Sequence, residues 1–98
     1  MDRQEEVQGR LFEWDEAKNS INIKKHGISF DLAAYVFADE NRIEIYDEIH
    51  SIDEDCYIVI GVVNKVLCVI CTERNDATRI ISARLATVKE RRMYYGDN

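Results

Sequence analysis

The chain has 98 residues, of which 46% are hydrophobic and 33% are charged, and its formal net charge is −6. A chain of this length and apolar content forms one compact domain that buries a single core without metal ions or disulfides. It holds no apolar run long enough to cross a bilayer and no apolar secretory segment behind its charged N-terminus, so a cytoplasmic protein with no membrane partner is expected.

The charge is unevenly distributed along the chain. Residues 1–60 hold fifteen acids and six bases, whereas residues 61–98 hold four acids and seven bases. The negative total argues against a nucleic-acid partner, but this asymmetry is able to leave a basic surface on an acidic molecule. The acidic stretch 39–55 is interpreted as a solvated edge and loop rather than as an acidic partner site.

The three cysteines, Cys56, Cys68 and Cys71, do not predict a disulfide framework, because their number is odd and the sequence shows no sign of export. Cys68 and Cys71 form a C-x-x-C inside VLCVICT, which is typical of a buried strand. An offset of three sends the two side chains to opposite faces of a strand. They are therefore interpreted as small buried hydrophobic residues, not as a metal or redox pair.

The first half of the chain carries clear start and stop signals for helices. Residues 15–26 are predicted to form a helix, because Asp15 is a good N-cap, cations occupy the last turn and Gly27 stands at the C-cap position. Ser29 is expected to cap a second helix that ends near Asp39.

The rest of the chain reads as one domain built around strands. Residues 1–11 are predicted to be a polar arm, frayed over its first ten residues, and residues 12–98 the single domain. Strands are predicted at 11–14, 42–46, 57–63, 66–72 and 78–84. Thr87 followed by Glu90 is a capping box that begins a last helix. The expected fold class is α+β: an antiparallel sheet of four to five strands with two N-terminal helices and a C-terminal helix, packed mainly on one face.

A helical wheel of the first helix separates two stripes. Trp14, Ala17 and Ile21 form an apolar stripe that is expected to face the sheet. The flanking polar stripe contains Lys18, Asn22, Lys25 and His26. Cations in a last helical turn also compensate the helix dipole, which suits Lys24 but does not explain Asn22 or His26.

A second candidate group consists of arginines, namely Arg74, Arg79, Arg84, Arg91 and Arg92. Arg79 and Arg84 are five residues apart on one predicted strand, so they are expected on opposite faces, with only Arg84 near the first helix. Singly each is interpreted as a surface charge, whereas together their guanidinium groups suit phosphate. Tyr94 and Tyr95 are suited to stacking on bases, although an aromatic pair at the end of a helix more often belongs to the core or to a partner contact.

No motif for a metal ion or a nucleotide cofactor is present, so neither is expected. A histidine with lysines and arginines fits metal-free RNA cleavage, in which the ribose 2′-hydroxyl attacks the adjacent phosphate. In this hypothesis His26 exchanges a proton, and Lys25 and Arg84 hold the phosphate. Glu90 orients or deprotonates a partner group.

The run W-D-x-x-K-x-x-x-N-x-x-K-H-G-I-x-F, here WDEAKNSINIKKHGISF, together with RIISAR and a following K-E-R-R-x-Y, resembles the BrnT family of bacterial type II toxins. These are small relatives of the RelE-like ribonucleases, and the similarity covers about residues 12–95. It implies a RelE-like fold and an RNA-cleaving toxin that arrests translation. It also implies a BrnA-type antitoxin that holds the toxin inactive and whose ribbon-helix-helix part binds operator DNA, so that DNA is reached only through the antitoxin.

Matching by motif carries over five residues, namely Lys25, His26, Arg84, Glu90 and Arg91. The expected catalytic residues are His26, Lys25, Arg84 and Glu90. The expected RNA-binding residues are Lys18, Asn22, Arg74 and Arg91. Residues 1–11 precede the usual start of the family, and the variable acidic stretch around Asp53 receives no catalytic role.

Two functions remain open from the sequence. The first is a metal-independent endoribonuclease. The second is a catalytically inactive binding module that sequesters an antitoxin and acts as a transcriptional co-repressor, a reading motivated by the acidic net charge.

Overall fold

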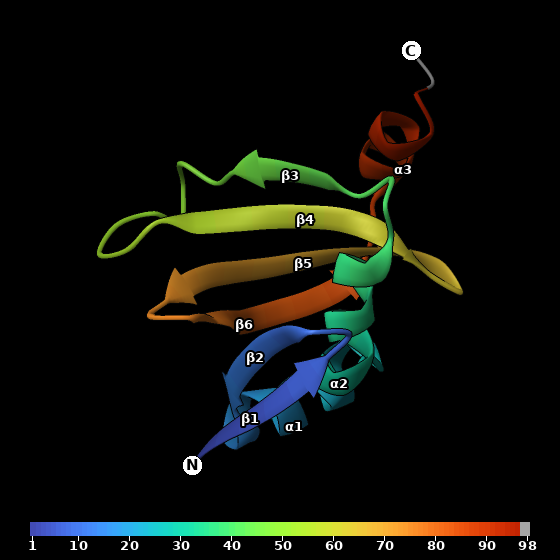
Figure 1. Ribbon diagram of the computed structural model, residues 1–98. Helices are drawn as coiled ribbons and strands as arrows, with labels where there is room; N and C mark the ends of the chain where they lie inside the picture. Colours follow the sequence, from blue (N-terminus) through green and yellow to red (C-terminus); the bar gives the residue numbers. More distant parts are fainter. Residues whose placement is uncertain (97–98) are drawn as a thin grey trace.

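The computed structural model describes residues 1–96, which form a six-stranded sheet with helices on both faces (Figure 1). The strands are β1 (Asp2–Val7), β2 (Arg10–Asp15), β3 (Ile43–Tyr46), β4 (Cys56–Val63), β5 (Lys65–Arg74) and β6 (Ala77–Leu85). Their order is β1-β2-β6-β5-β4-β3, and all neighbours are antiparallel except β2 and β6, which pair in parallel. The α+β class is confirmed, with six strands in place of the four to five expected.

The sixth strand is β1, which occupies residues that were expected to be a frayed polar arm. Gln8 and Gly9 have φ angles of 49° and 82°, and the turn they form lays β1 antiparallel on β2. Arg79 of β6 then joins the two strands, with ion pairs of 2.7 Å to Glu13 and 3.1 Å to Asp2. The expectation of a frayed arm was wrong because a strand at the edge of an antiparallel sheet can be exposed to solvent, and polar residues are then able to form it.

The helical elements are α1 (Glu16–His26), α2 (Phe30–Ala33), the 3₁₀ helix η1 (Ala34–Ala38) and α3 (Val88–Tyr95). The predicted caps are present: the Asp15 carboxylate accepts the Ala17 N–H at 2.8 Å, and Gly27 is left-handed with φ 71°. Thr87 and Glu90 complete the capping box. None of the helices within residues 1–96 has the length and apolar composition of a membrane span.

Two apolar clusters lie on opposite faces of the sheet. The larger cluster lies under α2 and η1 and includes Phe12, Trp14, Phe30, Val36, Val69 and Ile80. A Cβ added to Gly61 of β4 would lie 2.9 Å from Val36 Cγ1, so η1 packs directly on the backbone there. The smaller cluster places Tyr94 of α3 on Ile60, Val66 and Ala86. Helices therefore cover both faces, which corrects the expectation that they lie mainly on one.

The three cysteines are free and buried, in agreement with the sequence. Cys71 belongs to the larger cluster, whereas the Cys68 thiol lies 3.5 Å from Glu90 of α3 on the opposite face. Burial raises the pKa of both thiols to about 12. They are therefore protonated at neutral pH and belong to the packing of the domain.

Helix α1 buries asparagines instead of its apolar residues. Ala17 is exposed and Ile21 is 63% exposed, so the prediction that these two face the sheet was wrong. Asn19 and Asn22 are buried in their place. The Asn19 side-chain oxygen accepts the Phe30 N–H at 2.8 Å, which ties α1 to the start of α2.

Asn22 supplies the hydrogen bonds that a neighbouring strand would give to β6. Strand β2 pairs with β6 only at Thr78 and Arg79, so the following residues of β6 present an open edge to α1. The Asn22 amide nitrogen donates to the Ala83 carbonyl at 2.8 Å and to the Ile28 carbonyl at 2.9 Å, and its oxygen accepts the Ala83 N–H at 3.2 Å. Buried backbone groups need such partners, which explains why α1 packs through amides and not through Ile21.

Strand β6 contains a bulge that reverses the expected facing of its arginines. Ile70 pairs with Ser82, but the next residue of β5 pairs with Ile80, so Ile81 is an extra residue. Arg84 and Arg79 lie opposite Cys68 and Thr72, which are four residues apart on β5. The two arginines therefore share one face, and the prediction of opposite faces was wrong because the bulge shifts the alternation by one residue.

Helix α3 is fastened to the sheet by a bidentate ion pair. Arg84 Nη1 and Nη2 lie 2.7 Å and 3.0 Å from the two carboxylate oxygens of Glu90, whose side chain is 15% exposed. Glu90 also accepts the Thr87 N–H at 2.8 Å. The hydrogen bonds from Arg84 lower the pKa of Glu90 to about 2. A second contact joins the Tyr94 hydroxyl to the Asp39 carboxylate.

Replacing Asn22 by leucine, which has similar volume, should lower the free energy of unfolding by about 3 kcal/mol, because the backbone groups of Ala83 and Ile28 lose buried partners. Urea denaturation measures this change. Ser20→Leu, at an exposed position of the same helix, is the control and should change stability by about 0.5 kcal/mol or less. Equal effects of the two substitutions would contradict the role assigned to Asn22.

Glu90→Gln should lower the free energy of unfolding at pH 7 by roughly 2 kcal/mol, a figure that allows for partial exposure of the pair. The folded-state pKa of Glu90 is depressed to about 2, so its contribution is complete above the ordinary value of 4.5 and is lost as the pH falls toward 2. Denaturation at pH 7, 4.5 and 3 should therefore show the difference between variant and parent shrinking. The control is Glu54→Gln, which removes the exposed pair with Arg74 and should have little effect.

Candidate functional site

The C-terminal half of α1 and the bulged part of β6 enclose a hollow of about 250 Å³. Its lining consists of Lys18, Ile21, Asn22, Lys25, His26, Ile81 and Ser82. The four residues of the predicted polar stripe thus lie around one hollow. The extra residue of the bulge, Ile81, forms part of its wall, in keeping with the tendency of bulges to redirect side chains beside functional sites.

The cations of this hollow differ from most of the arginines because no carboxylate among residues 1–96 neutralises them. Six of the eight arginines form ion pairs with Asp or Glu. Within residues 1–96, Lys18, Lys25 and His26 form none, and all three are exposed. The carbonyl end of a helix carries partial negative charge, so an anion bound here must be held by these side chains rather than by the helix dipole.

Ser82 is a lining residue that the sequence did not single out. It pairs with Ile70, and Arg84 pairs with Cys68 two residues along β5, so the two side chains share a face. The hydroxyl of Ser82 is a neutral hydrogen-bond donor at the edge of the cationic group. Only the register of the bulged strand brings it to the hollow.

Asn22 lines the hollow, but its amide is bonded to the protein backbone. Its amide makes three hydrogen bonds to backbone atoms of Ile28 and Ala83 and is buried. Asn22 was expected among the RNA-binding residues, but both N–H groups of its amide are engaged by the backbone of the protein itself. Its position fixes the helix face that carries Lys18, Lys25 and His26.

Arg84 and Glu90 are brought together, as a pair that spans β6 and α3. With a pKa of about 2, Glu90 is ionised at neutral pH and is a weak base. Its geometry favours orientation of Arg84 over proton transfer. Arg84 uses one further N–H on the Leu85 carbonyl at 3.3 Å, and a guanidinium has five N–H donors in all, so two remain for a ligand.

The other two predicted residues lie elsewhere. Arg74 ends β5 at the β5–β6 turn and is paired with Glu54 at 2.9 Å. Ser82 of the hollow pairs with Ile70, four residues before Arg74 on β5, so Arg74 stands about 14 Å along the strand from the hollow and does not line it. Arg91 lies in the first turns of α3 and donates to the Ala86 carbonyl at 3.2 Å.

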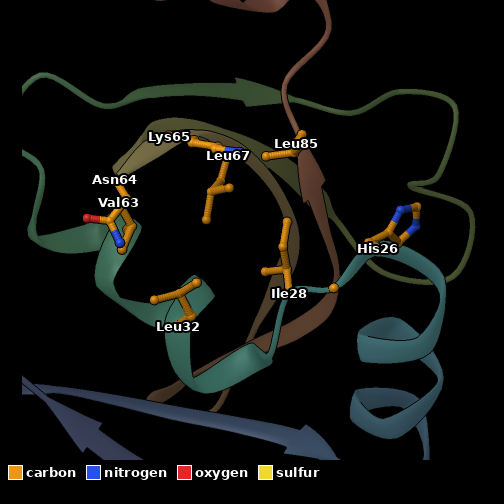
Figure 2. A pocket seen from close by; sticks show the side chains of 9 residues that line it. His26, Ile28, Leu32, Val63, Asn64, Lys65, Leu67 and Leu85 are labelled. Atoms are coloured by element: carbon orange, nitrogen blue, oxygen red, sulfur yellow. The ribbon is translucent and has the colours of Figure 1, made fainter.

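A second hollow, of about 280 Å³, begins at His26 and continues to the β4–β5 turn (Figure 2). Its lining is mostly apolar, with Asn64 and Lys65 at one side. Figure 2 shows His26 at the rim, on the end of α1. Lys65 was not recognised as a site residue, although it is the one Lys or Arg between Arg42 and Arg74 and is exposed at the start of β5.

The arrangement suits an anionic, partly apolar ligand. Lys18 and Lys25 can hold an anion, Ser82 can donate to it, and His26 adds an imidazole, the side chain used most often as a general acid or base. Within residues 1–96, no group of three His, Cys, Asp or Glu side chains is arranged to hold a metal ion. Phosphate esters are the ligand class for which cations and a proton carrier are useful together.

Comparison with known proteins identifies the family. The family model of the ribonuclease toxin BrnT of type II toxin-antitoxin systems matches residues 14–90. Among solved structures the chain is similar to the 1.1 Å crystal structure of the Brucella abortus ribonuclease toxin BrnT, with 26% sequence identity, a TM-score of 0.56, and coverage of 76% of this chain and 92% of that chain. A search of the curated proteins finds no significant match. Since the family model spans most of the chain and the fold agrees, the chain belongs to the BrnT family of ribonuclease toxins of type II toxin-antitoxin systems.

Proposed function

We propose that this protein is a metal-independent endoribonuclease with a RelE-like fold that cleaves RNA and inhibits translation. The observation that carries the proposal is the hollow in which Lys18, Lys25 and His26 gather with no carboxylate partner in the described part of the chain, whose full sequence has a net charge of −6. Such a local basic surface supplies the attraction for phosphate that the whole molecule lacks.

In the proposed reaction the ribose 2′-oxygen attacks the adjacent phosphorus and the bond from phosphorus to the 5′-oxygen breaks. The 2′-hydroxyl gives up one proton and the leaving 5′-oxygen takes one, so the products are a 2′,3′-cyclic phosphate and a 5′-hydroxyl. His26 carries one of these two proton transfers. Lys25 and Arg84 stabilise the charge that develops on the phosphate oxygens.

The remaining residues position this group. Glu90 holds the guanidinium of Arg84 through two hydrogen bonds, and Asn22 holds α1 against β6. Both are positioning residues because their polar atoms are occupied by the protein itself. Lys18, together with Arg91 at the start of α3, extends the basic surface along the bound RNA.

We further propose that the toxin acts in the cytoplasm and is neutralised there by a BrnA-like antitoxin with a ribbon-helix-helix DNA-binding part. The type II family supports a protein antitoxin as the partner. Operator DNA is then contacted only through the antitoxin, in keeping with the acidic charge of this chain.

Purified protein incubated with single-stranded RNA in EDTA should cleave it, because the proposed chemistry uses side chains alone. Analysis of the new ends should find a 5′-hydroxyl and a 2′,3′-cyclic or 3′-phosphate. A strict requirement for Mg²⁺, or products with a 5′-phosphate, would contradict the mechanism.

His26→Ala should lower the rate of cleavage roughly 100-fold or more, because a general acid or base contributes about this much. The matched control is His50→Ala, since His50 lies in the acidic β3–β4 loop and its ring nitrogen contacts Asp47 at 2.6 Å.

Lys25→Ala should reduce the rate by roughly 100-fold, whereas Lys24→Ala, which removes an exposed lysine outside the hollow, should change it little. Equal losses within either pair would show that the hollow is not the catalytic centre.

The second candidate is an inactive module that sequesters the antitoxin and acts as a co-repressor. The acidic net charge favours it, because RNA binding is opposed at long range. Expression without the antitoxin separates the two functions: growth arrest that His26→Ala abolishes supports the enzyme. Unaffected growth and mRNA, together with operator binding by the co-purified complex, support the module.

A further inference from the structure

We infer that the second hollow, between α1, α2 and the β4–β5 turn, binds one unstacked nucleobase of the RNA substrate (Figure 2). This inference rests on the proposed function and names the part of the substrate that the hollow recognises. The phosphate next to that base lies at the cationic hollow on the other side of His26.

The hollow has the surface that a base requires. Its floor is formed by Ile28 and Leu67, which are 5% and 2% exposed, and Leu32 faces them from α2. Leu85 forms a wall and is 49% exposed, so about half of a large apolar residue at the cavity is accessible to a ligand. Figure 2 shows these side chains around one space. A planar base is able to lie against such a surface, because single-stranded RNA is recognised through unstacked bases held by apolar and aromatic contacts.

Polar groups stand on one side of this space. Asn64 forms the β4–β5 turn with a φ of 64°, and Lys65 follows it as the first residue of β5. An amide offers both donors and an acceptor, the combination that reads the hydrogen-bonding edge of a base. Lys65 forms no ion pair within residues 1–96 and is suited to the phosphate of the same nucleotide.

Size and charge favour a nucleotide over a segment of protein. The volume of about 280 Å³ lies just below the range of small-molecule pockets, roughly 300–1,000 Å³, and suits a single planar group. None of the lining residues is acidic, and the rim carries Lys65 and His26. Because His26 borders both hollows, a phosphate in one and a base in the other would belong to neighbouring parts of one strand.

The test uses the full chain and single-stranded RNA made uncleavable by 2′-O-methyl groups, with one 2-aminopurine placed at successive positions. At one of these positions the fluorescence of 2-aminopurine should change when the protein binds. Leu85→Ala should remove that change and raise the Kd roughly tenfold, as expected for the loss of part of an apolar pocket. Val88→Ala is the control, because Val88 is 53% exposed and lies outside the hollow.

A second variant tests recognition of the base edge. Asn64→Gly keeps the left-handed backbone, which glycine adopts freely, and removes only the amide. The responsive position is the one at which 2-aminopurine changes its fluorescence on binding. For the Asn64→Gly variant, the ratio of the Kd values of two RNAs that differ only in the base at this position should fall toward one. This variant decides the question even if Leu85→Ala fails to give the native circular dichroism spectrum.

The outcomes separate this inference from the proposed function. His26-dependent cleavage without a responsive position, or with Leu85→Ala equal to Val88→Ala, would overturn the base pocket alone. If Leu85→Ala weakens binding of the antitoxin and leaves RNA binding unchanged, the hollow is a protein interface and the inference is wrong. Absence of both RNA binding and cleavage would overturn the base pocket and the proposed function together.

Discussion

The hydrogen bonds between the Asn22 amide and the Ala83 backbone hold the site together. Strand β6 has β5 on one side, but on the other it pairs with β2 at only two residues. The rest of that edge would be left without partners if a helix packed there through apolar side chains. One amide solves this, since it offers a donor and an acceptor in the manner of a neighbouring strand. Because α1 is attached at this point, its last two turns, with Lys25 and His26, come to rest beside the bulged residues of β6.

The bulge of β6 is the second constraint. It places Ile81 against α1 and changes the alternation of the strand, so that Arg79 and Arg84 share a face. The two arginines nevertheless do different work. Arg79 ties β1 and β2 to the sheet through two carboxylates, whereas Arg84 extends toward α3 and is held by Glu90. A single β-strand thus carries one arginine that joins β1 and β2 to the sheet and one that holds α3.

The electrostatics explain how an acidic protein keeps a basic surface. Most of its arginines form ion pairs with the abundant carboxylates, as Arg74 and Arg79 do. Within residues 1–96, the unpaired lysines around the two hollows lie on α1 and at the start of β5, beside the β4–β5 turn. The acidic β3–β4 loop lies at the opposite end of β4 from that turn (Figure 1). The length of β4 exceeds the Debye length at physiological ionic strength. The carboxylates of the loop therefore do little to weaken the attraction between an anion and these lysines.

The sequence by itself determined what depends on neighbours along the chain. Caps at Asp15, Ser29 and Thr87, the left-handed Gly27 and the apolar runs of the central strands are local features, and all of them are present. The polar stripe of α1 was also visible, because a helix places residues three and four apart on one side whatever lies beyond it. Only the tertiary structure decided which residues of other elements lie next to this stripe. The burial of Asn22, the exposure of Ile21, the addition of β1, the distance of Arg74 and the arrival of Lys65 beside His26 all depend on strand pairing between segments far apart in the chain. Helical periodicity cannot report an open strand edge or a bulge, since both are set by hydrogen bonds to residues elsewhere in the sheet.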